Sequence, residues 1–242
     1  MRSSPPTPLS DLLRPSARQL AAGAALVVLA FVWPLVSSGL VDLLGVRALA
    51  TALIFVSAGS LLVVGRVLPT GIALGGADSL ALIALVGAAA ASGERVFLLL
   101  VPCWVQVALA RMFWRSVRDG ESIFERVAFG IQPYAPDFIR PYCRRSTSVW
   151  AAYFLANALV IAALAVFGPL AWWRNFTGWI VWLAMGALAA GDYVVRKLYF
   201  RIYFDRPLDR LLARLFPSEN TAMGRRANEH RREMRLALGL PP

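Results

Sequence analysis

Three polar side chains interrupt runs of apolar residues, and they are the first candidates for chemistry in this sequence. They are Asp78, Gln106 and Asn157. A carboxyl group inside hydrocarbon is costly, so a transport role such as proton coupling is the first hypothesis for Asp78. A structural alternative is that Asp78 caps a helix that starts at Ser79 and lies nearer the membrane surface. Gln106 and Asn157 suit hydrogen bonds between membrane helices, which contribute about 1 kcal/mol each in model systems.

Other reactive groups lie among basic residues. Asp192 is followed by Arg196, so we expect it to pair with an Arg rather than act as an acid. His230 is the only His and stands in an Arg-rich segment, which argues against His-dependent base catalysis in the membrane. Cys143 has basic neighbours but no base nearby in the sequence, so we expect an inert or occasionally acylated thiol. A membrane-embedded acyl or glycosyl transferase would need a nucleophile or base that the sequence does not identify, with Cys143, Asp192 and Glu121 as weak candidates, so the sequence leaves open whether the protein is an enzyme and argues rather against it.

Several familiar catalytic and metal-binding patterns are absent from the sequence. It has no nucleophile elbow, no phosphate-binding loop and no paired aspartate motif of prenyl transfer. Its two Cys residues do not form a CxxC spacing. We therefore expect no metal site, no disulfide and no cofactor.

The composition of the chain indicates that these polar groups are held by membrane helices. The chain has 242 residues, of which 58% are hydrophobic and 16% are charged, whereas a soluble domain carries roughly 25% charged residues. A membrane crossing takes about 20 apolar residues, so six crossings use roughly half of the chain and leave no room for a separate soluble catalytic domain. We therefore predict an all-α, polytopic membrane bundle.

Six apolar runs predict six transmembrane helices. They are residues 19–41, 48–65, 70–92, 96–110, 148–167 and 177–195. Together they form a predicted transmembrane domain over residues 19–195. The parts expected in the cytoplasm are an N-terminal segment, a basic loop and a basic tail, at residues 1–18, 111–147 and 196–242. Pro169 ends the fifth run beside Trp172 and Trp173, which we expect at the membrane interface. A signal peptide over residues 17–38 is the alternative interpretation of the first run.

Positive charge is distributed unequally over this topology. Of the 25 Arg and Lys residues, all but Arg47, Arg95 and Arg174 fall on one side. The positive-inside rule then places both termini and the basic loop in the cytoplasm. Five or seven helices would separate the loop from the tail, so the charge pattern also favours six.

Two short amphipathic helices are expected in the cytoplasmic parts. The spacing Ser122-x-x-Glu125 is a capping box, and the helix after it has an apolar face that includes Ile123, Phe124 and Val127. In the tail, apolar residues repeat at helical spacing while Arg210 and Arg214 lie on another face. The apolar residues of this second helix are Leu208, Leu211, Leu212, Leu215 and Phe216.

The net charge of +11 indicates anionic partners. Membrane lipid is one, because each basic residue near an anionic leaflet contributes about 1 kcal/mol. An acidic soluble protein is the other. Nucleic acid is not expected, because neither an aromatic-interleaved strand platform nor a groove-reading helix is present in the sequence.

Three segments resemble a family of bacterial inner-membrane proteins found with acyl-carrier-protein-dependent biosynthesis of aryl polyene and xanthomonadin-type pigments. The segments are FWRSVRDGESIFERVAF at 113–129, YCRRSTSVWAAYF at 142–154 and GDYVVRKLYF at 191–200. The second fits the pattern Tyr-x-Arg-x-x-Thr-x-x-Trp entering a helix, and the third fits an acidic residue followed by Tyr-x-x-Arg. Asp192 stands where the family pattern has Glu. The first three predicted helices share only hydrophobicity with the family.

The resemblance implies a biosynthetic setting in the cytoplasmic membrane rather than a reaction. Acyl carrier proteins are strongly acidic, so a basic cytoplasmic surface suits their docking. We therefore expect an accessory protein that recruits carrier-bound acyl chains, or soluble enzymes acting on them, to the bilayer. The residues expected to dock carrier or lipid are Arg115, Arg118, Arg144, Arg145, Arg196 and Lys197. The alternative is a transporter or flippase for a lipid-like product, with Asp78, Gln106 and Asn157 as its candidate residues. The oligomeric state stays open.

Overall fold

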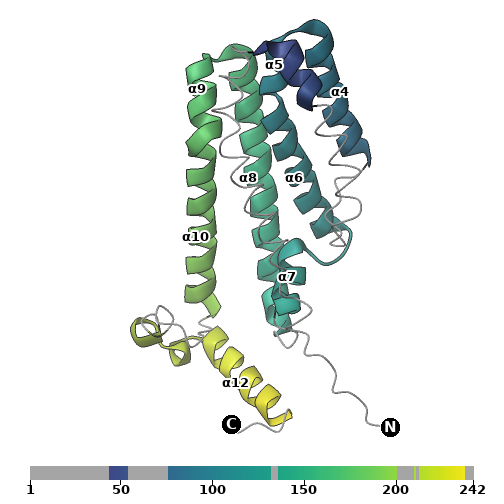
Figure 1. Ribbon diagram of the computed structural model, residues 1–242. Coiled ribbons are helices and arrows are strands. Elements are labelled where there is room, and N and C mark those ends of the chain that lie inside the picture. The colour runs from purple at the N-terminus through teal and green to yellow at the C-terminus, as the bar shows by residue number, and fades with distance from the viewer. Residues whose placement is uncertain (1–43, 54–75, 132–135, 201–209, 211–212, 238–242) are drawn as a thin grey trace, which may run out of the picture. The chain divides into compact units, whose positions relative to one another are not determined.

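The computed structural model describes residues 44–53, 76–131, 136–200, 210 and 213–237 of the chain. Within these residues all regular structure is helical, as the sequence predicts. The longer helices, labelled in Figure 1, are α4 (Gly76–Ser92), α6 (Val101–Arg118), α8 (Arg140–Phe167), α10 (Val181–Phe200) and α12 (Ala222–Ala237). The shorter elements are α5 (Arg95–Leu99), α7 (Ile123–Ile131), α9 (Leu170–Asn175) and the turns η1 (Asp137–Ile139), η2 (Phe176–Ile180) and η3 (Ser218–Asn220).

Three of the described helical stretches are long and apolar enough to cross a membrane. They are Arg95–Arg118, Asp137–Phe167 and Leu170–Phe200, of 24, 31 and 31 residues. They indicate a multi-pass membrane protein and coincide with the last three predicted runs. At the third run, the described apolar helix, Leu80–Ser92, is shorter. The first two predicted runs lie wholly or mostly outside the described residues, so the number six stays a prediction.

The helices extend further into the basic segments than the sequence predicts. α6 continues to Arg118 and α8 begins at Arg140, so both ends of the predicted loop are helical. α10 likewise continues to Phe200. Arg has a high helix propensity, and its long side chain carries the charge away from the helix axis. A helix therefore does not have to end where its apolar residues end.

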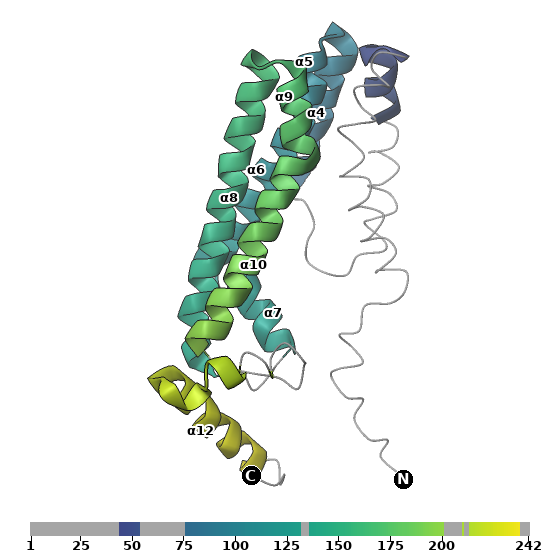
Figure 2. The ribbon, with the colours of Figure 1, turned by 90° about the vertical axis from the view of Figure 1, so that its left-hand side faces the viewer.

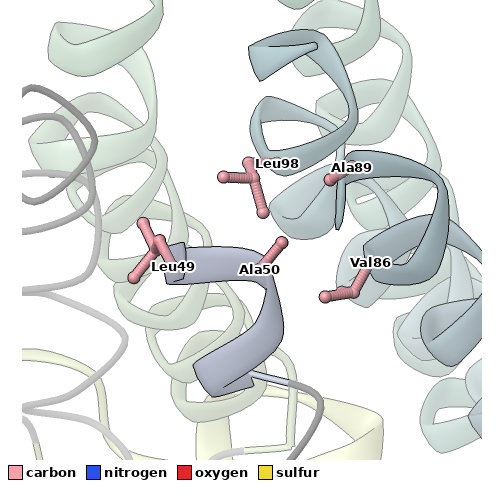
Figure 3. Close-up of a cluster of buried hydrophobic side chains, with 5 residues drawn as sticks. All are labelled: Leu49, Ala50, Val86, Ala89 and Leu98. Atoms are coloured by element: carbon pink, nitrogen blue, oxygen red, sulfur yellow. The ribbon is translucent and has the colours of Figure 1, made fainter. Parts of the chain in front are cut away.

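The chain divides into two compact units, which are described separately. The first unit comprises residues 1–122 and 147–182, and the second comprises residues 123–146 and 183–242. In the first unit, a cluster of buried side chains joins the helical segment 46–53 to α4 and α5 (Figure 3). Its members are Leu49, Ala50, Val86, Ala89 and Leu98. α4 also packs against α6, as Figure 2 shows.

Pro102 breaks the first candidate span between α5 and α6. Proline has no N–H and clashes with the preceding helical turn, and here α5 ends at Leu99 and α6 begins at Val101. The Leu99 carbonyl accepts a 3.2 Å hydrogen bond from the indole Nε1 of Trp173, a fully buried side chain. A neighbouring helix thus satisfies a carbonyl at the break, as a membrane span requires. Trp173 is thus buried in the protein, whereas Trp172 is 65% exposed, and their position at the membrane interface stays a prediction.

A second contact in the first unit fixes the last candidate span against α8. The π-helical turn η2 lies between α9 and α10, and such turns disturb the regular pairing of carbonyls along a helix. The Tyr153 hydroxyl donates a 2.6 Å hydrogen bond to the carbonyl of Val181, the residue that follows this turn. Within the turn, Thr177 Oγ1 donates a 2.8 Å bond to the Trp173 carbonyl. Side chains therefore stabilise the turn from both sides.

Candidate functional site

A carboxylate joins the start of α8 to the end of α10 in the second unit. Asp192 Oδ1 accepts a 2.6 Å hydrogen bond from the Ser146 hydroxyl and a 2.9 Å bond from the Tyr142 hydroxyl. The Tyr142 hydroxyl also lies 3.0 Å from the Asp192 carbonyl. Tyr142 and Ser146 are four residues apart, so both face the same neighbour on α10. The partners of Asp192 are thus hydroxyl groups, where the sequence predicted an arginine.

Aromatic rings hold Tyr142 in place for this contact. The ring of Phe200, which is buried, meets the Tyr142 ring edge-on with centroids 5.2 Å apart. The ring of Phe138 in η1 stacks on the same Phe200 ring, with centroids 6.1 Å apart. Such ring pairs contribute about 0.5–1.5 kcal/mol beyond their buried area. The tyrosine hydroxyl is therefore presented to Asp192 by a packed aromatic group.

A second carboxylate, which is buried, joins α7 to α8. α7 begins directly after Ser122, as the capping box predicts. The Glu125 side chain is 3% exposed and lies 3.9 Å from Arg144 Nη1, whose side chain is 44% exposed. Val127, on the predicted apolar face of α7, is 50% exposed. Burial of Glu125 is possible because a cation lies beside it, which offsets part of the cost of removing a carboxylate from water.

Arg140 supports the same junction between α7 and α8. Its guanidinium carbon lies 4.1 Å from the centroid of the Phe129 ring on α7, and its Nε donates a 2.9 Å hydrogen bond to Asp137. The cation therefore covers an aromatic face while pairing with a carboxylate. Asp137, the most exposed acidic residue of this junction, is thus paired within the unit.

The arginines proposed for docking are exposed, but the lysine is not. Arg115 and Arg118 are exposed in the first unit, and Arg144, Arg145 and Arg196 are exposed in the second. Lys197 is only 7% exposed, and its Nζ lies 5.7 Å from the centroid of the Tyr193 ring. Lys197 is thus part of the packed interior of the second unit rather than of its exposed basic surface.

The residues considered for transport are not joined by any contact among the described residues. Asn157 is buried, and its Nδ2 donates a 2.8 Å hydrogen bond to the Tyr153 carbonyl of its own helix, not to another helix as the sequence predicted. Gln106 Oε1 is buried and has no hydrogen-bond partner in the described part of the chain. Asp78 is the third residue of α4, and its side chain lies outside the described residues.

The residues considered for transferase chemistry do not form a catalytic arrangement among the described residues. Cys143 is buried, so its thiol is shielded from a soluble acyl donor. Asp192 is engaged by two hydroxyl groups, and Glu121 is an exposed residue of the first unit. His230 lies within α12.

The tail contains a helix that the sequence analysis missed. In the predicted tail helix, Leu215 and Phe216 are exposed, whereas Leu208, Leu211 and Leu212 lie outside the described residues. The unpredicted helix is α12, which begins after Thr221. Thr221 Oγ1 accepts a 3.1 Å hydrogen bond from the Gly224 N–H, an N-cap that is the one sequence signal for this polar helix.

The three segments that carry the family resemblance touch one another in pairs. In the first unit, Phe113 stacks on Trp150 with centroids 6.5 Å apart. In the second unit, Tyr142 bonds to Asp192, so the first residue of one motif meets the acidic residue of the other. Comparison with known proteins finds no matching family model, no similar curated protein and no similar solved structure.

Proposed function

We propose that this protein is a membrane accessory component that recruits carrier-bound acyl chains, or soluble enzymes acting on them, to the bilayer. The supporting observation is the separation of charge in the second unit. Its helices α7, the start of α8 and the end of α10 present exposed arginines, and the acidic residues of the same helices are engaged within the unit. On these helical segments the exposed arginines therefore outnumber the exposed carboxylates, whereas η3 and α12 also carry the exposed Glu219, Glu229 and Glu233.

Internal contacts keep these arginines together. Glu125 joins α7 to α8 through Arg144, and Asp192 joins α8 to α10 through two hydroxyl groups. Arg126 follows the first carboxylate, and Arg196 stands one helical turn after the second. The carboxylates thus serve to position helices that carry exposed cations, which is an arrangement suited to an acidic partner.

The chemistry of the partner follows from the arginines. Guanidinium groups form paired, charge-assisted hydrogen bonds with carboxylates and phosphates, and clustered charge raises the rate of association with an oppositely charged protein. An acyl carrier protein matches this chemistry because it is acidic. The family resemblance supplies the setting, polyene or lipid-like pigment biosynthesis, and the contact between Tyr142 and Asp192 supports a common role for its motifs.

Binding of a purified acyl carrier protein to the protein in zwitterionic nanodiscs tests this proposal. The docking variant replaces three exposed arginines of the second unit: R126Q/R145Q/R196Q. The matched control replaces three exposed arginines of the first unit: R47Q/R95Q/R174Q. Arg144 is kept in both because it lies beside the buried Glu125. We expect the docking variant to bind about tenfold more weakly, since exposed ion pairs contribute up to about 1 kcal/mol each.

The control should bind within about twofold of the unchanged protein, because it loses the same charge at other positions. Equal weakening in both variants would show that only net charge matters, and unchanged binding in the docking variant would refute the proposal. In cells that lack the protein, late carrier-bound acyl chains should accumulate while the membrane product disappears. Mass spectrometry of both pools measures this, and two unchanged pools would reject the biosynthetic setting.

A further inference from the structure

The end of α6, in the first unit, carries a basic surface with an exposed aromatic ring. Trp114 is 49% exposed, and the guanidinium carbon of Arg118 lies 5.2 Å from the centroid of its ring. Arg115 is exposed beside them. Trp114 and Arg118 are four residues apart, so they lie on one face of the helix. These three residues are called the α6 end patch.

The α6 end patch stands at the end of a candidate membrane span. Arg95–Arg118 contains 24 residues, which corresponds to about 36 Å of helix, whereas the hydrocarbon layer is about 30 Å thick. A last turn at residues 114–118 therefore reaches the headgroup layer. Trp favours that layer, and Arg extends its charge toward it. α6 contains no acidic residue, and the nearest ones, Asp119 and Glu121, follow its last residue.

We infer that the α6 end patch binds the headgroup phosphate of an anionic phospholipid. The Trp114 ring holds one face of the Arg118 guanidinium, which limits its freedom before binding and leaves its N–H groups for a phosphate. Arg115 supplies a second cation within one turn. An anionic lipid is favoured over a zwitterionic one because its headgroup carries no cation to oppose two guanidinium groups. This site goes beyond carrier recruitment, which uses arginines of the second unit.

The chain offers a matched control for this site. Trp172 and Arg174 are also an exposed Trp and an exposed Arg in the first unit. They are two residues apart, and residues at that spacing do not face each other on a helix. In the described part of the chain, no stacking contact joins them. Removing Arg174 therefore removes an exposed charge near a tryptophan without removing a prearranged guanidinium.

The experiment compares lipid retention by variants reconstituted with equal amounts of phosphatidylglycerol and phosphatidylcholine. After mild detergent extraction, native mass spectrometry counts the lipids that remain bound. R115Q and R118Q should each lower the bound ratio of phosphatidylglycerol to phosphatidylcholine about fivefold. W114L should lower it about threefold, because the guanidinium loses its aromatic support. R174Q should leave the ratio unchanged.

Two results would overturn the lipid site: unchanged enrichment in R115Q and R118Q, or an equal loss in R174Q. Carrier binding by the same preparations separates this inference from the proposed function. Retained carrier binding with lost lipid enrichment supports the site. Lost carrier binding with unchanged lipid enrichment assigns the α6 end patch to the carrier and rejects the lipid. Circular dichroism and size-exclusion profiles verify that each single variant is folded.

Discussion

The two units of this protein hold their helices together by different kinds of contact. In the first, aromatic donors reach backbone carbonyls, from Trp173 to Leu99 and from Tyr153 to Val181. In the second, the carboxylates of Asp192 and Glu125 meet hydroxyl groups and a guanidinium. The first arrangement uses no charged group in these contacts, whereas the second engages carboxylates and leaves arginines at the surface. This difference is the basis of our proposal that an acidic partner binds the second unit.

The largest effect is expected from breaking the carboxylate contact of the second unit. Asp192→Ala removes the acceptor of two hydroxyl groups, and hydrogen bonds to charged groups contribute about 1.5–3 kcal/mol each. We expect the free energy of unfolding in detergent to fall by about 3 kcal/mol. Asp192→Asn is the control, since it keeps an acceptor oxygen and should lose roughly half as much. A variant Asp192→Ala as stable as the original protein would contradict this role.

A somewhat smaller effect is expected at the junction of η3 and α12, also in the second unit. A Cβ at Gly224 would overlap the backbone of Ser218, so Gly224→Ala should destabilise this junction by about 2 kcal/mol. Faster hydrogen exchange in α12 measures the loss. Gly186→Ala is the control, because a Cβ there meets nothing within 4 Å. Equal exchange in both variants would show that the close packing at Gly224 is unimportant.

In the first unit, the corresponding test removes a single neutral hydrogen bond, from the Tyr153 hydroxyl to the Val181 carbonyl. Tyr153→Phe removes the donor to the Val181 carbonyl and should cost about 1 kcal/mol, less than the loss of the Asp192 carboxylate. Thermal unfolding in detergent measures it. Tyr199→Phe serves as the comparison, since Tyr199 is 53% exposed. If Tyr153→Phe destabilised more than Asp192→Ala, the contrast between the two units would be reversed.

No effect on recruitment is expected at the residues considered for transport. Asp78→Asn in α4 leaves the second unit unchanged, so carrier binding should stay within about twofold of the original value. Under the transport alternative, the same substitution stops export of a lipid-like product because proton coupling is lost. Measuring carrier binding and product export on one variant therefore separates the two hypotheses.

Features that depend on local sequence could be predicted. The helices at the last three apolar runs follow from composition, the start of α7 follows from its capping box, and the end of α8 at Phe167 follows from Pro169. Gly93 lies in the turn between α4 and α5 and adopts a φ of 75°. Glycine takes this left-handed conformation without steric cost.

Features that depend on contacts between distant parts of the sequence could not be predicted. Tyr142 and Asp192 are 50 residues apart, and no periodicity in either helix indicates that they meet. Lysine is a residue type that usually lies at the surface, and Lys197 is buried only because of the packing of the second unit. α12 is strongly polar, so it lacks the apolar repeat that identified the other helices. The candidate site was therefore predicted as a set of exposed cations, without the carboxylates that organise it.

Site-specific photocrosslinking tests directly whether an acyl carrier protein binds the second unit. A photoreactive phenylalanine at position 127, an exposed position of the second unit beside Arg126, is compared with one at position 175, an exposed position of the first unit. Each protein is irradiated in nanodiscs with an acyl carrier protein. We expect a salt-sensitive crosslink to the carrier from position 127 and none from position 175. A crosslink from position 175 alone, or equal crosslinks from both, would contradict binding of the carrier to the second unit.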